Sequence, residues 1–195
     1  MDVGELGCDL LSATGRKFLR GPRGIGFLYV AERLIPDLEP PFLDLHSAEW
    51  TSPGRYRIRS DARRFESWEA NVAAKIGLGV AVDQALGWGL AAIEQRVSAL
   101  AAGLREQLRE RPGVRVHDRG EALCGIVTFT VDGIPAPHVV ERLRQAQVNT
   151  SVSYAGSSRL DLPHRGLAEV VRASVHYYNN DDDLDRLLNT LPSPA

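Results

Sequence analysis

The sequence predicts an α/β protein, because two apolar patterns alternate along it. Short runs rich in β-branched and aromatic residues, such as 25–30 and 126–131, are typical of strands. Apolar residues three or four positions apart, such as Ile93, Val97 and Leu100, are typical of a helix that buries one face. Together these patterns predict strands, a long loop, two helices and then the order β-α-β-β-α.

The N-terminal part predicts a sheet followed by a linker. One apolar run ends at Leu10-Leu11, and a second, bounded by glycine, occupies residues 25–30. Prolines and the pair Pro53-Gly54 then interrupt regular structure. We expect residues 1–43 to belong to one sheet, 44–64 to form a loop or linker, and 65–195 to form a separate small α/β domain.

Two consecutive helices open the small domain. Val72, Ile76 and Val80 are four residues apart and share one helical face, and the glycines at 87 and 89 mark a break. The second helix carries an apolar stripe at Ile93, Val97, Leu100, Leu104 and Leu108.

The rest of the small domain alternates strands and helices. Val114 and Val116 alternate with polar residues, strands are predicted at 126–131, 148–152 and 170–175, and helices at 137–145 and from about 180 onward. Three aspartates at 181–183 suit the first turn of the last helix, where the helix dipole favours negative charge.

Composition narrows the class of protein. The 195 residues are 44% hydrophobic and 25% charged, as is common for soluble globular proteins. A net charge of −2 argues against a dedicated nucleic-acid binder, and two distant cysteines give no metal or disulfide spacing. The sequence shows no long apolar span and no signal peptide. We therefore expect a cytoplasmic protein without a nucleic-acid, membrane or metal partner.

One lysine stands out among the basic residues. Of 23 Lys and Arg residues only Lys17 and Lys75 are lysines, and Lys17 lies among Arg16, Arg20 and Arg23. Lysine can lose its proton beside other cations and form a Schiff base, which arginine cannot do. The alternative is a solvated basic loop.

Three motifs resemble one enzyme family. Gly15-Arg16-Lys17 followed by Gly21-Pro22-Arg23-Gly24-Ile25-Gly26 and an apolar strand resembles the class V aminotransferase superfamily of pyridoxal-phosphate enzymes, which includes cysteine desulfurases and selenocysteine lyases. Arg64-Phe65-Glu66 and the segment 172–179 resemble two further motifs of that family, in the same order. The resemblance covers essentially the whole chain.

The resemblance implies a cofactor and roles for four residues. Lys17 is expected to form a Schiff base with the aldehyde of pyridoxal 5'-phosphate and then to act as the base at the substrate α-carbon. Thr14 and Arg16 are expected to lie against the cofactor phosphate, although most desulfurases have histidine where Arg16 stands. Arg172 is expected to hold the α-carboxylate of an amino-acid substrate, the alternative being a surface ion pair.

Two other positions have no assigned role. Glu69 stands where many relatives have a threonine that contacts the neighbouring subunit's phosphate, and a carboxylate would repel that group. His176 lies within the Arg172 motif and is equally compatible with a site role and a structural role.

The resemblance also implies the architecture. It predicts the end of the large sheet domain of a fold-type I pyridoxal-phosphate enzyme, joined to a complete small C-terminal α/β domain. Only 16 residues precede Lys17, whereas the family places much of its cofactor site upstream, including an Asp that pairs with the pyridine nitrogen. We therefore expect the C-terminal half of such an enzyme, forming a homodimer; the alternative is a catalytically inactive fragment.

The reaction type is narrowed by one absence in the sequence. Desulfurases need a cysteine in the loop before the Arg172 strand, and residues 153–161 contain none. A transaminase, an epimerase or a carbon–sulfur lyase remains compatible. The segment 64–69 resembles lyases that cleave hercynylcysteine sulfoxide. A third hypothesis, phosphate or RNA binding by the basic loop, is disfavoured because stacking aromatics are scarce there.

Overall fold

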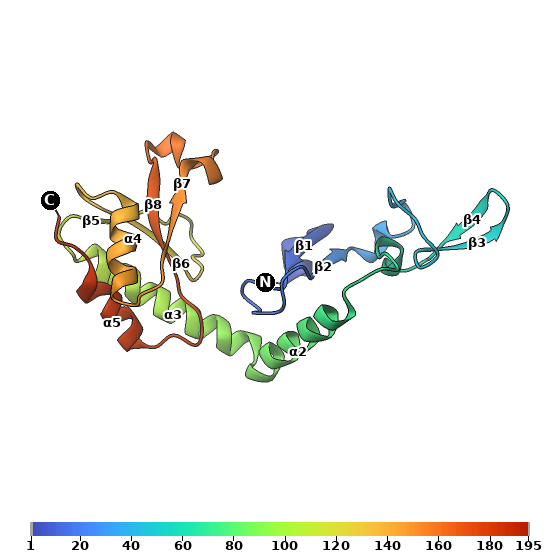
Figure 1. Ribbon diagram of the computed structural model, residues 1–195, viewed down its shortest axis with the longest axis horizontal. Coiled ribbons are helices and arrows are strands. Elements are labelled where there is room, and N and C mark those ends of the chain that lie inside the picture. The colour runs from blue at the N-terminus through green and yellow to red at the C-terminus, as the bar shows by residue number, and fades with distance from the viewer. Residues whose placement is uncertain (1, 195) are drawn as a thin grey trace. The chain divides into compact units, whose positions relative to one another are not determined.

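The computed structural model describes residues 2–194, and the chain divides into two compact units, 1–87 and 88–195 (Figure 1). Every strand pairing lies within one of these units. No single helix among the described residues is long and apolar enough to cross a membrane; α2 and α3 meet that criterion only when added together as a bent pair.

The first unit begins with a two-stranded antiparallel ribbon. A one-turn helix α1 (Val3–Leu6) precedes β1 (Leu10–Thr14), which pairs with β2 (Gly26–Val30) so that Thr14 lies opposite Gly26. Strand β2 lies within the apolar run predicted at 25–30, whereas β1 begins at Leu10, where the first apolar run was expected to end. A 3-10 turn, η1 (Glu32–Leu34), follows.

The segment 44–64 contains a β-hairpin rather than the loop that we expected. Strands β3 (Ala48–Ser52) and β4 (Arg55–Ile58) pair antiparallel, and Gly54 takes a left-handed φ of 75° at the turn. The Pro-Gly pair is therefore the hairpin turn, not the end of regular structure. The strands escaped prediction because most of their residues are exposed, so no apolar alternation marks a buried face.

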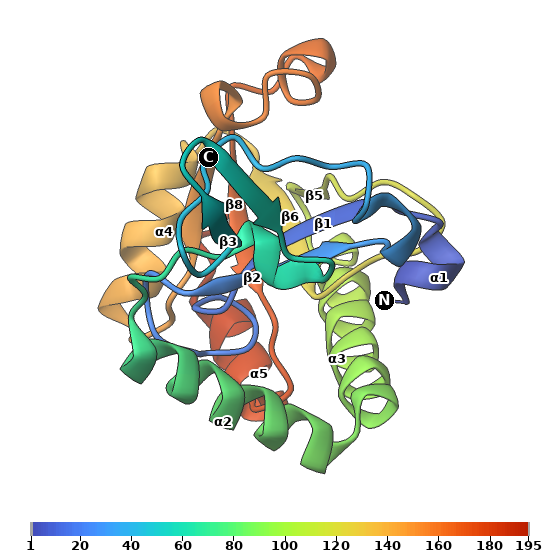
Figure 2. The same ribbon diagram turned by 90° about the vertical axis from the view of Figure 1, so that its right-hand side faces the viewer.

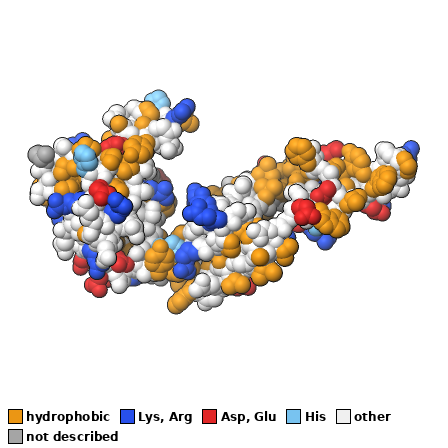
Figure 3. Space-filling model, in the orientation of Figure 1, with side chains coloured by type: hydrophobic (Ala, Val, Ile, Leu, Met, Phe, Trp, Pro, Cys, Tyr) orange, Lys and Arg blue, Asp and Glu red, His pale blue; other side chains and the backbone are white. Residues whose placement is uncertain are grey.

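Helix α2 packs through small residues. It follows the 3-10 turn η2 (Ala62–Phe65) and runs from Val72 to Trp88, burying Ala74, Leu78 and Ala85. The stripe that the sequence shows most clearly, Val72, Ile76 and Val80, is instead 64% exposed at each position. In Figure 3, hydrophobic side chains also gather over the surface around β3 and β4.

The second unit is a four-stranded antiparallel sheet with three helices. Its elements are α3 (Leu90–Arg109), β5 (Val114–Val116), β6 (Ile126–Val131), α4 (Ala136–Gln145), β7 (Ser151–Tyr154), β8 (Glu169–Ser174) and α5 (Asp181–Thr190). The strand order is β5-β6-β8-β7. The strand expected at 148–152 thus begins three residues later than predicted.

The helices cover one face of this sheet (Figure 2). Alternate residues of β6 and β8 join the apolar stripe of α3 in one buried cluster with α4 and α5. Asn180 and Asp183 cap α5 reciprocally. The other face of the sheet carries Arg172, in register between Thr128 of β6 and Ser151 of β7.

Candidate functional site

The loop between β1 and β2 presents Lys17 to solvent. Gly15 N donates to Ile25 O and Gly21 N donates to Gly15 O, both at 2.9 Å, so the loop folds back on itself where β1 ends. A turn closed by Arg20 N and Lys17 O at 2.9 Å follows, with Arg20 at a left-handed φ of 58°. Thr14, Arg16 and Lys17 are all exposed at this strand end.

Two glycines of this motif, Gly15 and Gly21, lie against α2. A Cβ at Gly15 would lie 2.6 Å from Leu78 Cδ1, and one at Gly21 would lie 3.1 Å from the same atom. On the helix side, a Cβ at Gly77 would lie 2.8 Å from Pro22 Cγ. Only residues without side chains allow this approach, so the Gly-Pro-x-Gly pattern holds the lysine loop on the helix.

The two lysines differ in what they contact. Within residues 2–194, the Lys17 side chain makes no hydrogen bond or ion pair, whereas Lys75 Nζ lies 3.5 Å from Glu66 Oε1. Lys17 therefore has an amine that no other described group engages, on a rigidly packed loop.

The Arg-Phe-Glu motif supports the region next to this loop. Arg64 is buried and donates to the carbonyls of Arg59 at 2.8 Å, Leu38 at 3.2 Å and Ile35. A buried guanidinium without acceptors is costly, so these three carbonyls account for its burial. Arg64 thereby joins the segment after β2 to the segment after β4.

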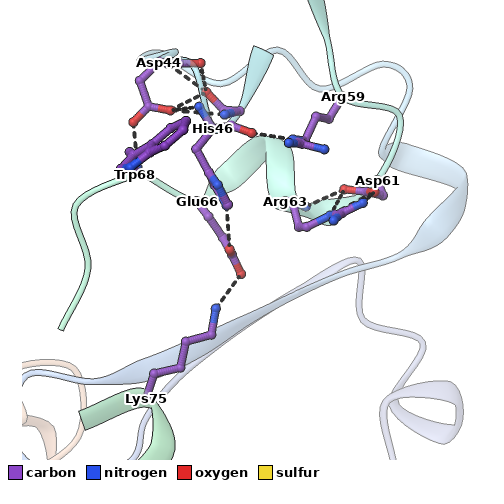
Figure 4. A network of polar contacts seen from close by, with 9 residues as sticks. Asp44, His46, Arg59, Asp61, Arg63, Glu66, Trp68 and Lys75 are labelled. Atoms are coloured by element: carbon purple, nitrogen blue, oxygen red, sulfur yellow. Dashed lines mark hydrogen bonds and ion pairs between the residues drawn. The ribbon is translucent and has the colours of Figure 1, made fainter. Parts of the chain in front are cut away.

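Glu66 of the same motif connects three segments (Figure 4). Its carboxylate lies 3.1 Å from His46 Nε2 and 3.5 Å from Lys75 Nζ. The hydrogen bond to His46, with the charge of Lys75, lowers the pKa of Glu66. We had interpreted His46 as an ordinary surface or packing residue; its 20-residue separation from Glu66 leaves no local sequence signal.

Asp44 organises the turn beside that pair (Figure 4). It accepts from Trp68 N at 2.7 Å, His46 N at 2.8 Å and Ser47 N at 3.1 Å. These backbone bonds, led by that from Trp68, lower the pKa of Asp44 to about 2.

Arg172 carries an unsatisfied donor. Its Nε is buried on β8 and has no hydrogen-bond partner among the described residues, and Thr150 Oγ1 is in the same situation. Arg172 also makes no ion pair within residues 2–194, so the surface pair that we considered as an alternative is not formed there. Because an unpaired buried donor is destabilising, its presence is a reason to expect an acceptor from a ligand.

A buried ion pair fixes the strand next to Arg172. Arg105 of α3 and Asp118 have only 4% and 8% of their side chains exposed, with Nε and Oδ2 2.7 Å apart. Arg105 also donates to the carbonyls of Cys124 and Ile126, and Asp118 Oδ1 accepts from Thr128 N and Oγ1. Sequence patterns missed this pair because Arg105 looks like part of the solvated face of α3.

His176 and Glu69, the two positions without an assigned role, lie outside the lysine loop. His176 is buried, its N–H donates to Asn179 Oδ1 at 2.9 Å, and its ring stacks on Tyr178 with centroids 4.4 Å apart. The hydrogen bond is made by the backbone N–H, so these contacts fit a structural role without testing the role in the site, which stays a prediction. Glu69 is exposed. Thr14, Arg16 and Lys17 thus share one loop of the first unit, and Arg172 lies in the second.

The chain is similar to known proteins over nearly its whole length. The family model for class V aminotransferases matches residues 1–187. A probable cysteine desulfurase of Methanothermobacter thermautotrophicus is 27% identical over 100% of this chain and 50% of its own length. A probable hercynylcysteine sulfoxide lyase of Mycobacterium tuberculosis is 33% identical over 95% of this chain and 45% of its own.

Solved structures show the same fold. The cysteine desulfurase CsdA of Escherichia coli superposes with a TM-score of 0.85 at 26% identity, covering 97% of this chain and 46% of that one. The apo cysteine desulfurase of Thermococcus onnurineus superposes with a TM-score of 0.87 at 28% identity, covering 96% of this chain and 47% of that one. The chain spans about half the length of the curated relatives it matches. The predicted α/β fold class is confirmed, and the chain belongs to the class V aminotransferase family.

Proposed function

We propose that this chain takes part in pyridoxal-phosphate-dependent chemistry on an amino-acid substrate, of the carbon–sulfur lyase type. The observation that carries the proposal is the uncommitted amine of Lys17, exposed on a loop that α2 holds in place. Pyridoxal phosphate, when bound, supplies an aldehyde for an amine and a ring that accepts electrons from the substrate.

The residues present fit that cofactor and substrate. At the end of β1 an amine, the hydroxyl of Thr14 and the guanidinium of Arg16 are exposed together, which suits an aldehyde beside a phosphate. Lys17 in its neutral form can take a proton from the substrate α-carbon. The unpaired Nε of Arg172 suits a carboxylate, which its guanidinium can bind through two hydrogen bonds.

The β7–β8 loop favours lysis over persulfide formation. Residues 155–168, which join these strands, contain no cysteine, and Cys124 and Cys8 lie elsewhere in the chain. A desulfurase cysteine is therefore missing from the position that the family uses. The similarity to a protein named as a hercynylcysteine sulfoxide lyase supports the same choice. Transamination uses the same lysine and remains the second candidate.

The proposal includes self-association. Val72, Ile76 and Val80 form an apolar stripe that no described residue covers, and such a stripe is typical of an interface. We propose that a second copy of the chain covers it.

The test is a visible absorbance titration with pyridoxal phosphate, followed by borohydride reduction and peptide mapping. We expect a saturable band in the wild-type chain and in Lys75→Ala, and its loss in Lys17→Ala. Because the chain has only these two lysines, Lys75→Ala is a matched control. Equal weak labelling of all three proteins would instead favour the inactive fragment.

A further inference from the structure

Five of the eight residues that line a hollow on the second unit are arginine or histidine. It has a volume of about 410 Å³ and lies between β5 and the β7–β8 loop. Its lining consists of Arg115, His117, Arg119, Leu160, Asp161, His164, Arg165 and Leu167. None of these residues belongs to the lysine loop or to the Arg172 strand.

The positive charge of this hollow is poorly compensated. Asp161 is its only carboxylate, and it is already engaged by Arg165, with Oδ2 and Nη1 2.9 Å apart. The side chains of Arg115, Arg119 and His164 make no hydrogen bond or ion pair within residues 2–194. Like charges gathered in one concave place repel one another unless a counter-charge is bound there.

The walls of the hollow are held in place by the fold. Arg165 has a side chain only 12% exposed, and its Nη2 donates to His117 O at 2.5 Å, which ties the loop to the end of β5. His117 Nε2 lies 2.8 Å from Thr130 Oγ1. Leu162 is buried beneath the loop and accepts from Leu167 N at 2.9 Å. Arg165 and His117 are therefore preorganised, whereas the side chains of Arg115 and Arg119 are exposed.

We propose that this hollow is a binding site for a small oxyanion, the phosphate or carboxylate group of a small molecule. Guanidinium groups form paired, charge-assisted hydrogen bonds with such anions. The side chains of Arg115 and Arg119 supply hydrogen-bond donors from the β5 side of the hollow. The anchored Arg165 supplies a fixed positive charge from the β7–β8 loop.

The state of His117 agrees with uncompensated charge. Burial, followed by the charges of Arg165 and Arg115, lowers the pKa of His117, with a smaller opposite contribution from Asp118 and a further lowering by Arg119. A bound anion adds negative charge next to the imidazole and so raises this pKa. The His117 ring is thus a reporter inside the hollow.

The experiment titrates the full chain with inorganic phosphate at constant ionic strength, following the His117 ring by NMR, with acetate as the carboxylate arm. We expect saturable binding that raises the pKa of His117. In Arg115→Gln/Arg119→Gln the phosphate affinity should fall at least about tenfold, since both substitutions remove charge-assisted hydrogen bonds to the anion.

Arg109→Gln/Arg186→Gln removes the same charge outside the hollow and should leave the affinity within about twofold, as expected for distant surface charges at constant ionic strength. The proposal is overturned if both double variants lose the same phosphate affinity, or if phosphate leaves the pKa of His117 unchanged. If the first double variant does not fold, Arg119→Gln alone is measured against Arg109→Gln with the same criterion. Lys17→Ala should bind phosphate normally, which separates this site from the proposed cofactor chemistry.

Discussion

Asp44 shows how much of the first unit depends on single side chains. Its carboxylate accepts from three backbone N–H groups, those of His46, Ser47 and Trp68, and thereby joins the turn before β3 to the segment before α2. An acceptor of this kind must be ionised to act fully, which is why its pKa lies near 2 instead of 3.8.

This gives a pH-dependent prediction. Because the folded-state pKa is depressed, the stabilisation is fully present above the unfolded value near 4 and is lost as the pH falls toward about 2. In urea unfolding, the free energy of unfolding of the wild type should exceed that of Asp44→Ala by a constant amount above pH 5. This difference should shrink below pH 4. Asp37→Ala, an exposed aspartate without side-chain contacts among residues 2–194, is the control. A pH-independent difference would contradict this account.

At the scale of elements, the glycines of α2 have opposite roles. Gly77 faces Pro22 of the lysine loop, and a Cβ built on Gly77 would lie 2.8 Å from Pro22 Cγ. A Cβ built on Gly79 would have no such neighbour within 4 Å. Glycine inside a helix is destabilising relative to alanine by about 0.5–1 kcal/mol. Gly77 is therefore kept for the close contact, and Gly79 has no such constraint.

Alanine substitutions should separate these two effects. We expect Gly79→Ala to raise the free energy of unfolding by about 0.5–1 kcal/mol, and Gly77→Ala to lower it by about 1–3 kcal/mol through overpacking. Thermal and urea unfolding measure both. Stabilisation by both substitutions would mean that the loop does not rest on the helix in solution.

Elements could be predicted from the sequence wherever burial follows the helical or strand period. In α3 the stripe from Ile93 to Leu108 is buried as the spacing indicates. In α2 the clearest stripe is exposed, because small residues and Leu78 make the contact with the loop instead. The β3–β4 hairpin had no buried face to mark it.

The candidate site was only partly predictable for a related reason. Lys17, Thr14 and Arg16 are neighbours in sequence, so a motif found them together. Contacts between distant segments, such as His46 with Glu66 or Arg105 with Asp118, carry no periodic signal and require the fold.

For the whole molecule, the uncovered stripe of α2 predicts the assembly state. Burying one isoleucine at an interface contributes about 1.5–3 kcal/mol, so Ile76→Asp should weaken self-association at least about tenfold. Sedimentation velocity over a concentration series measures this. Gln107→Asp adds the same charge at an exposed position of α3, away from the stripe, and should behave as wild type. Identical association of Ile76→Asp and wild type would exclude the stripe as the interface.

The contact of Leu78 with two glycines also has a genetic consequence. Because one methyl group fills the space that a side chain at position 15 or 21 would need, these three positions are epistatic. An alanine at Gly15 requires the end of the Leu78 side chain to move, and a smaller residue 78 should relieve that contact. Variation at the lysine loop is thus constrained by a helix more than fifty residues further along the chain, and second-site suppressors of loop mutations belong there.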